Sequence, residues 1–178
     1  MVKVQEPGKL TILEPMEATE QTERCMIHLD DNIYVVAKMY DEALQIYIRQ
    51  YNQFGDKLYP SKKGVVLNLS RWLLLEVNLA KIDQHVKIPI DDSHHLGGGG
   101  GVCLNSRYTT INIRHFWKPV GASQALPTKR SIVLKKVNWE WLKHSITLIR
   151  DYVPELNDAH ICQYSEDHTN VMGMLTYQ

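Results

Sequence analysis

The sequence predicts an α+β fold in which two β-β-β-β-α units follow each other in one chain. A motif of proline, basic pair, apolar strand and tryptophan occurs twice, at Pro60–Trp72 and at Pro127–Trp139. The prolines and the tryptophans are offset by the same 67 positions (127 − 60 and 139 − 72). Ahead of each motif, apolar and polar residues alternate, which is typical of strands with one buried face. We therefore expect one structural unit that is used twice.

The first unit is expected at residues 25–84, after an acidic, aperiodic arm at residues 1–24. Its residue types and turn signals predict strands at 25–29, 33–40, 43–51 and 65–69, with a polar loop at 52–63 before the last. Ser70 stands where an N-cap is expected, ahead of the helical run at 71–82. The helix face with Trp72 should pack on the sheet face that carries the isoleucines, so this tryptophan is predicted to be a core anchor.

The second unit is expected at residues 85–153, with a C-terminal extension at 154–178 that docks as a short helix or strand. The same signals predict strands at 85–90, 102–104, 108–117 and 132–137. Asn138 is predicted to cap a helix that carries the core anchor Trp139 and stops near Pro154.

The run Gly97–Gly101 lies between the first two strands of the second unit. It is interpreted either as a natural floppy loop or as an engineered linker in place of a disordered insertion. A strand follows it rather than a helix N-terminus, so no phosphate-binding role is assigned to it.

Both units also share an ordered set of shorter motifs. Unit one reads Ile48-Arg49-Gln50-Tyr51, then Pro60-Ser61-Lys62-Lys63-Gly64, then Trp72. Unit two reads Ile113-Arg114-His115-Phe116-Trp117, then Pro127-Thr128-Lys129-Arg130, then Trp139. This set resembles the single-stranded-DNA-binding domain of the positive cofactor four family of transcriptional coactivators, and the Whirly and Pur-alpha proteins are built on a similar unit.

That family works as a homodimer of single domains, so the resemblance implies an intramolecular pseudo-dimer with central helices and curved antiparallel sheets outside. Three features depart from the family pattern. Asn52 stands where a second aromatic residue would fall, Ser131 replaces the glycine, and the second loop is two residues longer because the arginines are offset by only 65 positions (114 − 49).

A binder of unstacked strands combines a basic groove with aromatic platforms. The candidate basic residues are Lys38, Arg49, Lys57, Lys62 and Lys63 in unit one, and Arg107, Arg114, Lys118, Lys129 and Arg130 in unit two. The candidate stacking residues are Tyr34, Tyr47 and Tyr51 in unit one, and Phe116 and Trp117 in unit two. For Tyr51 and Phe116 the sequence fits a core position as well as a stacking position. Trp117 directly follows Phe116 and should point to the opposite face, which makes it the better platform of the two.

The composition limits the alternatives. The 178 residues carry 20 basic and 20 acidic side chains, so no global field attracts a polyanion and any such site must be local. No apolar run reaches the roughly 18 residues of a membrane span. Three cysteines outside any CxxC pair are typical of reduced thiols, so we expect an intracellular protein. The resemblance to transcriptional coactivators implies a nuclear location, and the alternatives are a mitochondrial protein or a viral protein in the host nucleus or cytoplasm.

Two classes of function remain. The first is a single-stranded DNA-binding protein of transcription, replication or repair, with RNA as an alternative ligand. The second is an assembly module that keeps the fold for contacts with transcription, replication or viral proteins. No catalytic motif is present, and the His94-His95 doublet beside flexible glycines is a poor metal site, so no enzyme activity, metal or cofactor is expected. A homodimer of the two-unit chain is possible because four-stranded sheets leave edges to cover.

Overall fold

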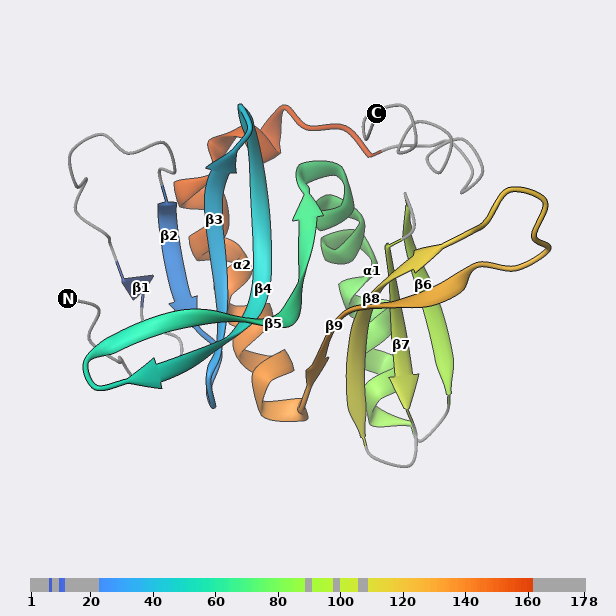
Figure 1. The fold of residues 1–178 in the computed structure, drawn as a ribbon, viewed down its shortest axis with the longest axis horizontal. Coiled ribbons are helices and arrows are strands. Elements are labelled where there is room, and N and C mark those ends of the chain that lie inside the picture. Colours follow the sequence, from blue (N-terminus) through green and yellow to red (C-terminus); the bar gives the residue numbers. More distant parts are fainter. Residues whose placement is uncertain are drawn as a thin grey trace.

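A computed structural model of the protein describes residues 23–88, 91–97, 100–105 and 109–161, together with Pro7, Leu10 and Thr11. These residues form an α+β fold with two antiparallel sheets and two α-helices (Figure 1). In each sheet the strands are neighbours in the order in which they occur in the chain. Antiparallel sheets and the α+β class are therefore as predicted.

The first sheet comprises β1 (Leu10–Thr11), β2 (Glu23–His28), β3 (Ile33–Tyr40), β4 (Ala43–Phe54) and β5 (Lys57–Asn68), and α1 (Leu69–Lys87) follows it. The second comprises β6 (Asp92–Gly97), β7 (Gly100–Asn105), β8 (Thr110–Trp117) and β9 (Leu126–Leu134). It is followed by α2 (Lys136–Tyr152) and the short 3-10 helix η1 (Pro154–Asn157). The predicted order of four strands and one helix, twice, is thus observed, with β1 and η1 added at the two ends.

One continuous core lies between the helices and the inner faces of the two sheets. Trp72 and Trp139 are fully buried in it, together with Ile46 and Ile48 of β4 and the equivalent isoleucines of β8. The alternation of apolar and polar residues along β4 places the isoleucines on this inner face. The prediction that both tryptophans are core anchors is therefore confirmed.

The predicted loop at 52–63 is wrong, because these residues form the outer half of a long β4–β5 hairpin. Only the turn at Gly55 and Asp56 separates the strands, and Gly55 has a positive φ of 60°. A glycine adopts this conformation without steric cost, so the turn can be this short. Pro60 stands inside β5, at a position where the pairing with β4 is irregular and a missing N–H is tolerated.

The predicted strand at 85–90 is also wrong where the chain is described, because α1 continues through Lys87. Ile82 and Val86 are four residues apart and both contact the core, so the helical period extends beyond the predicted end at 82. The first strand of the second unit is β6, which begins at Asp92. Residues of the glycine run stand in β6 and β7, so Gly97, Gly100 and Gly101 belong to strands rather than to a loop.

The helix starts differ from the predicted ones by a few residues. Asn68, not Ser70, caps α1, and its side-chain oxygen accepts the N–H of Arg71 at 2.9 Å. Strand β9 covers 126–134 instead of 132–137, and Lys135 is the N-cap residue of α2. The predicted cap, Asn138, is the third helical residue, and its side chain reaches back to the N–H of Lys135 at 2.9 Å.

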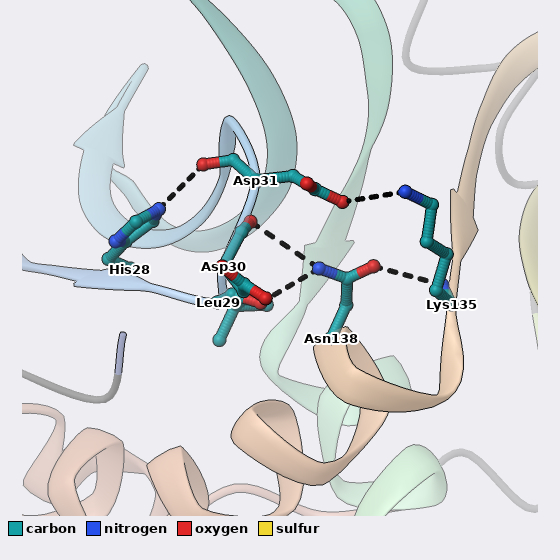
Figure 2. A network of polar contacts seen from close by, with 6 residues as sticks. All are labelled: His28, Leu29, Asp30, Asp31, Lys135 and Asn138. Carbon is teal, nitrogen blue, oxygen red and sulfur yellow. Dashed lines mark hydrogen bonds and ion pairs between the residues drawn. The ribbon is translucent and has the colours of Figure 1, made fainter. Parts of the chain in front are cut away.

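Asn138 also joins the two units, as Figure 2 shows. Its fully buried amide donates to the carbonyl oxygens of Leu29 at 2.8 Å and of Asp30 at 3.4 Å, in the turn between β2 and β3. The Lys135 ammonium contacts the Asp31 carboxylate at 3.0 Å. Asp30 and Asp31 both have positive φ values, 76° and 49°, so a strained turn of the first unit is held by the start of the second helix.

The two helices contact each other through ion pairs. Arg150 of α2 forms an ion pair with Glu76 of α1, and Lys143 of α2 contacts Asp83 of α1 at 2.7 Å. Because the lower-numbered residue of one helix faces the higher-numbered residue of the other, the helices run antiparallel. Each helix contacts strands of both sheets: α1 touches β4, β5, β6 and β7, and α2 touches β2, β3, β8 and β9. No helix among the described residues is long and apolar enough to cross a bilayer.

Candidate nucleic-acid interface

An irregularity interrupts the β4–β5 hairpin at the predicted basic pair. Arg49 is opposite Gly64 and Tyr51 is opposite Pro60, so residues 61–63 stand across from a single residue of β4. The N–H of Lys63 donates to the Ser61 hydroxyl at 3.1 Å, which closes a tight local turn. Lys62 and Lys63 are exposed. We refer to residues 61–63 as the first basic bulge.

The β8–β9 hairpin has the same irregularity. Arg114 is opposite Ser131 and Phe116 is opposite Pro127, which leaves residues 128–130 across from His115 alone. The N–H of Arg130 donates to the Thr128 hydroxyl at 3.2 Å, as Lys63 does to Ser61, and the Thr128 hydroxyl donates to the carbonyl of His115 at 2.9 Å. Lys129 and Arg130 are exposed. Residues 128–130 form the second basic bulge.

Arg49 and Arg114 stand beside these bulges on the outer faces of the sheets. The Nε atom of each is buried and has no hydrogen-bond partner in the described part of the structure. A Cβ atom on Gly64 would lie 2.9 Å from both Cβ and Cγ of Arg49, so the glycine lets this side chain cross the strand. Each guanidinium therefore has one donor that the described part of the protein leaves without an acceptor.

The three tyrosines predicted to stack bases in unit one are buried. Tyr34, Tyr47 and Tyr51 form a second apolar cluster with Met26 and Val36 on the outer face of the first sheet. Cations already lie over one of the rings, with the Lys38 ammonium 4.5 Å and the Arg49 guanidinium 5.3 Å from the centre of Tyr47. Such burial does not favour base stacking on these rings.

Burial also sets the ionisation of this cluster. It raises the pKa of Tyr51 to about 12, and the charge of Glu23 acts in the same direction. Burial raises the pKa of Tyr34 and of Tyr47 as well. The three phenols are therefore neutral at physiological pH and serve as packing groups.

The two aromatic residues of unit two, Phe116 and Trp117, lie on opposite faces of β8, as their adjacent positions in the sequence predict. Phe116 is partly buried and lies against Gly101, where an added Cβ would come within 2.9 Å of the ring. Trp117 points to the other face and is 52% exposed. Trp117 is thus available for stacking.

The remaining basic candidates are more scattered. Lys57 is exposed at the start of β5, Lys38 is partly buried on β3, and Lys118 is partly buried after β8. Arg107 lies outside the described residues. The geometry therefore gathers the basic pairs and the two arginines into two equivalent sites, and it leaves Lys38 and Lys118 at their margins.

His115 lies where the two sheets approach each other. It has a hydrogen bond with the Val66 backbone of β5, and its side chain is close to Arg71 of α1 and Arg130 of the second bulge. Burial lowers the pKa of His115 to about 4, and the charges of Arg71 and Arg130 act in the same direction. The imidazole is therefore neutral at pH 7 and adds no charge to this junction. Arg71 is absent from the basic candidates predicted from the sequence. Arg71 lies in the first turn of α1, where no acidic residue offsets the partial positive charge of the helix N-terminus, and this pattern would have indicated local positive charge.

Sequence reasoning also missed two exposed aromatic residues on the β4–β5 hairpin. Phe54 is 65% exposed and Tyr59 is 48% exposed, and their ring centres are 5.8 Å apart. Both were hidden by the prediction of a loop, because residues in a loop have no assignable face.

Comparisons of the chain with models of known protein families, with curated proteins and with solved structures find no match. Cys25 and Cys103 are free thiols, and burial raises the pKa of both. In the described segments, no group of three or more histidine, cysteine or acidic residues is placed to hold a metal ion.

Proposed function

We propose that this chain binds single-stranded nucleic acid, with DNA as the expected ligand, through the two basic bulges. The observation that carries the proposal is the repetition of one local geometry. In both hairpins an arginine with an unpaired buried Nε stands beside a bulge that exposes two cations. This places positive charge at two equivalent positions on a protein whose net charge is zero.

The distribution of ion pairs supports this function. Other cations, such as Arg24, Lys135 and Arg150, contact carboxylates of the protein. None of the four bulge cations does so within the described residues, although all four are exposed. Exposed cations that contact no carboxylate of the described residues are suited to replace the counterions of a phosphate backbone.

We further propose that the two units form an intramolecular pseudo-dimer similar to the homodimer of the positive cofactor four family. The antiparallel pairing of α1 and α2 supports this arrangement. The indole of Trp139 in α2 also donates to Asp83 of α1 at 3.2 Å, which adds a further contact between the two helices. Action in transcription, replication or repair in the nucleus is the setting that this resemblance suggests.

The test is a fluorescence-polarisation titration with labelled single-stranded and duplex oligonucleotides at several salt concentrations. The logarithm of the association constant for single strands should fall with log[salt] by about 0.7 for each phosphate contact. Replacing the four bulge cations with alanine should weaken binding and make this slope shallower by about 0.7 for each contact that is lost. Lys81→Ala/Lys136→Ala, which removes two exposed helix cations, is the control and should leave the slope unchanged.

Tighter binding to duplex than to single strands, or binding without salt dependence, would contradict the proposal. The second candidate is a protein assembly module, which the exposed apolar side chains on both hairpins also fit. Loss of a protein partner in the four-alanine variant, together with no nucleic-acid binding by the unmodified chain, would favour that function instead.

A further inference from the structure

The exposed apolar side chains of the outer strands gather beyond the two basic bulges. On the first hairpin these are Phe54 and Tyr59, and on the second they are Trp117 and Leu126, the latter 53% exposed. In Figure 1 the two hairpins leave the body of the molecule on opposite sides. Each hairpin therefore carries a basic bulge and, farther out, an exposed apolar patch.

The ladder positions of these side chains correspond. Just beyond the first bulge, Asn52 of β4 is opposite Tyr59 of β5. Just beyond the second, Trp117 of β8 is opposite Leu126 of β9. Cross-strand partners point to the same face of a sheet. At this pair of facing positions each hairpin thus carries one aromatic ring on the same face. In the first hairpin the ring is on β5, and in the second it is on β8.

The local packing keeps the ring of Tyr59 outside the buried tyrosine cluster. Leu58, its neighbour in β5, packs against that cluster, and successive side chains of a strand point to opposite faces. Tyr59 therefore faces away from the cluster, toward the side on which Phe54 lies. The two rings are inclined by 60° and form an exposed aromatic pair with Lys57 between them in the chain.

We propose that Tyr59, supported by Phe54, is the base-stacking platform of the first unit and replaces the aromatic residue missing at position 52. The inference rests on the proposed function, and the ligand is an unstacked base of a single strand. The charge of the hairpin favours this ligand, because Lys57, Lys62 and Lys63 outnumber the single carboxylate of Asp56 in residues 54–63. Exposed rings flanked by unpaired cations match both the faces of bases and the phosphates that join them.

The decisive experiment removes the aromatic ring from β5 and then restores a ring at the facing position of β4. Tyr59→Ala should weaken binding of a labelled oligo-dT by about 5- to 150-fold, since one stacked base contributes about 1–3 kcal/mol. The salt slope should stay unchanged, because no phosphate contact is lost. Asn52→Trp in the Tyr59→Ala background should restore most of the affinity by supplying a ring from β4, as Trp117 does from β8.

Tyr59→Phe, which keeps the ring, should bind like the unmodified chain, and Val77→Ala removes an exposed apolar side chain from α1 as a control. Unchanged affinity of Tyr59→Ala, or no recovery in the double variant, would overturn the inference while the proposed function still stood. A defect of Tyr59→Ala in protein capture alone would overturn it too. If the unmodified chain binds no single strand in the first titration, the proposed function itself fails.

Discussion

Replacing His115 with glutamine should make the protein less sensitive to mild acid. The pKa of this imidazole is lowered from 6.5 to about 4 by burial and by the nearby charges of Arg71 and Arg130. Between these two pH values the unfolded chain binds a proton that the folded protein excludes. Stability is therefore fully present above pH 6.5 and is lost as the pH falls toward 4.

The magnitude follows from the size of the shift. Each unit of pKa corresponds to 1.36 kcal/mol, so the lowered pKa of His115 accounts for a loss of about 3 kcal/mol between pH 6.5 and 4. Urea unfolding at pH 4, 5, 6 and 7 should show this loss in the unmodified chain, and His115→Gln should remove most of it. The lowered pKa values of Asp83 and Glu155 remove stability chiefly as the pH falls below about 5, and this loss is common to both proteins.

The matched control is His160→Gln, which removes an exposed imidazole near the end of the described chain. The reasoning is refuted if His115→Gln and the unmodified chain lose stability in parallel between pH 6.5 and 4. An NMR titration that places the pKa of His115 near 6.5 would refute it independently.

Two further substitutions test the structure of the bulge and of the junction between the units. Gly64→Ala places a Cβ atom 2.9 Å from Arg49 and from the Ile48 carbonyl. We therefore expect the free energy of unfolding to fall by about 1–3 kcal/mol and the affinity for oligo-dT to decrease. Normal affinity would show that the position of the arginine is unimportant for binding. Asn138→Leu leaves the Leu29 carbonyl without its amide donor, so it should lower the free energy of unfolding by about 1–3 kcal/mol. Thermal or urea unfolding measures this loss, and an unchanged midpoint would contradict the prediction.

The parts of the fold that the sequence predicts correctly are those fixed by local pattern. The alternation in residues 43–51 is a strand because its isoleucines fall on one face, and Trp72 and Trp139 are buried because helical spacing turns them toward the sheets. The repeated motif also located both basic pairs, which the structure places in equivalent bulges. These features depend on neighbours within a few residues, so a single sequence is sufficient to find them.

The errors arise where distant residues decide the outcome. Helix α1 passes its predicted end because Val86 packs on a core that includes strands of the second sheet. Tyr34, Tyr47 and Tyr51 are predicted from the sequence to stack on a ligand, yet they pack together on the neighbouring strands β3 and β4 and are buried. No local signal distinguishes a ring that stacks on a ligand from a ring that stacks on the protein.

The unequal outer strands have a consequence that a symmetric dimer does not share. In a homodimer both halves carry the same residue at each ladder position, whereas a fused chain can move a side chain between facing strands. Here the ring of the first hairpin stands on β5, the strand that holds Lys62 and Lys63, and the ring of the second stands on β8, the strand that holds Arg114. Because facing residues share one side of the sheet, either placement presents the ring to the same side. Under the proposed function each hairpin would offer one ring and one basic bulge to nucleic acid, so a substitution in one hairpin would change the affinity of that hairpin alone.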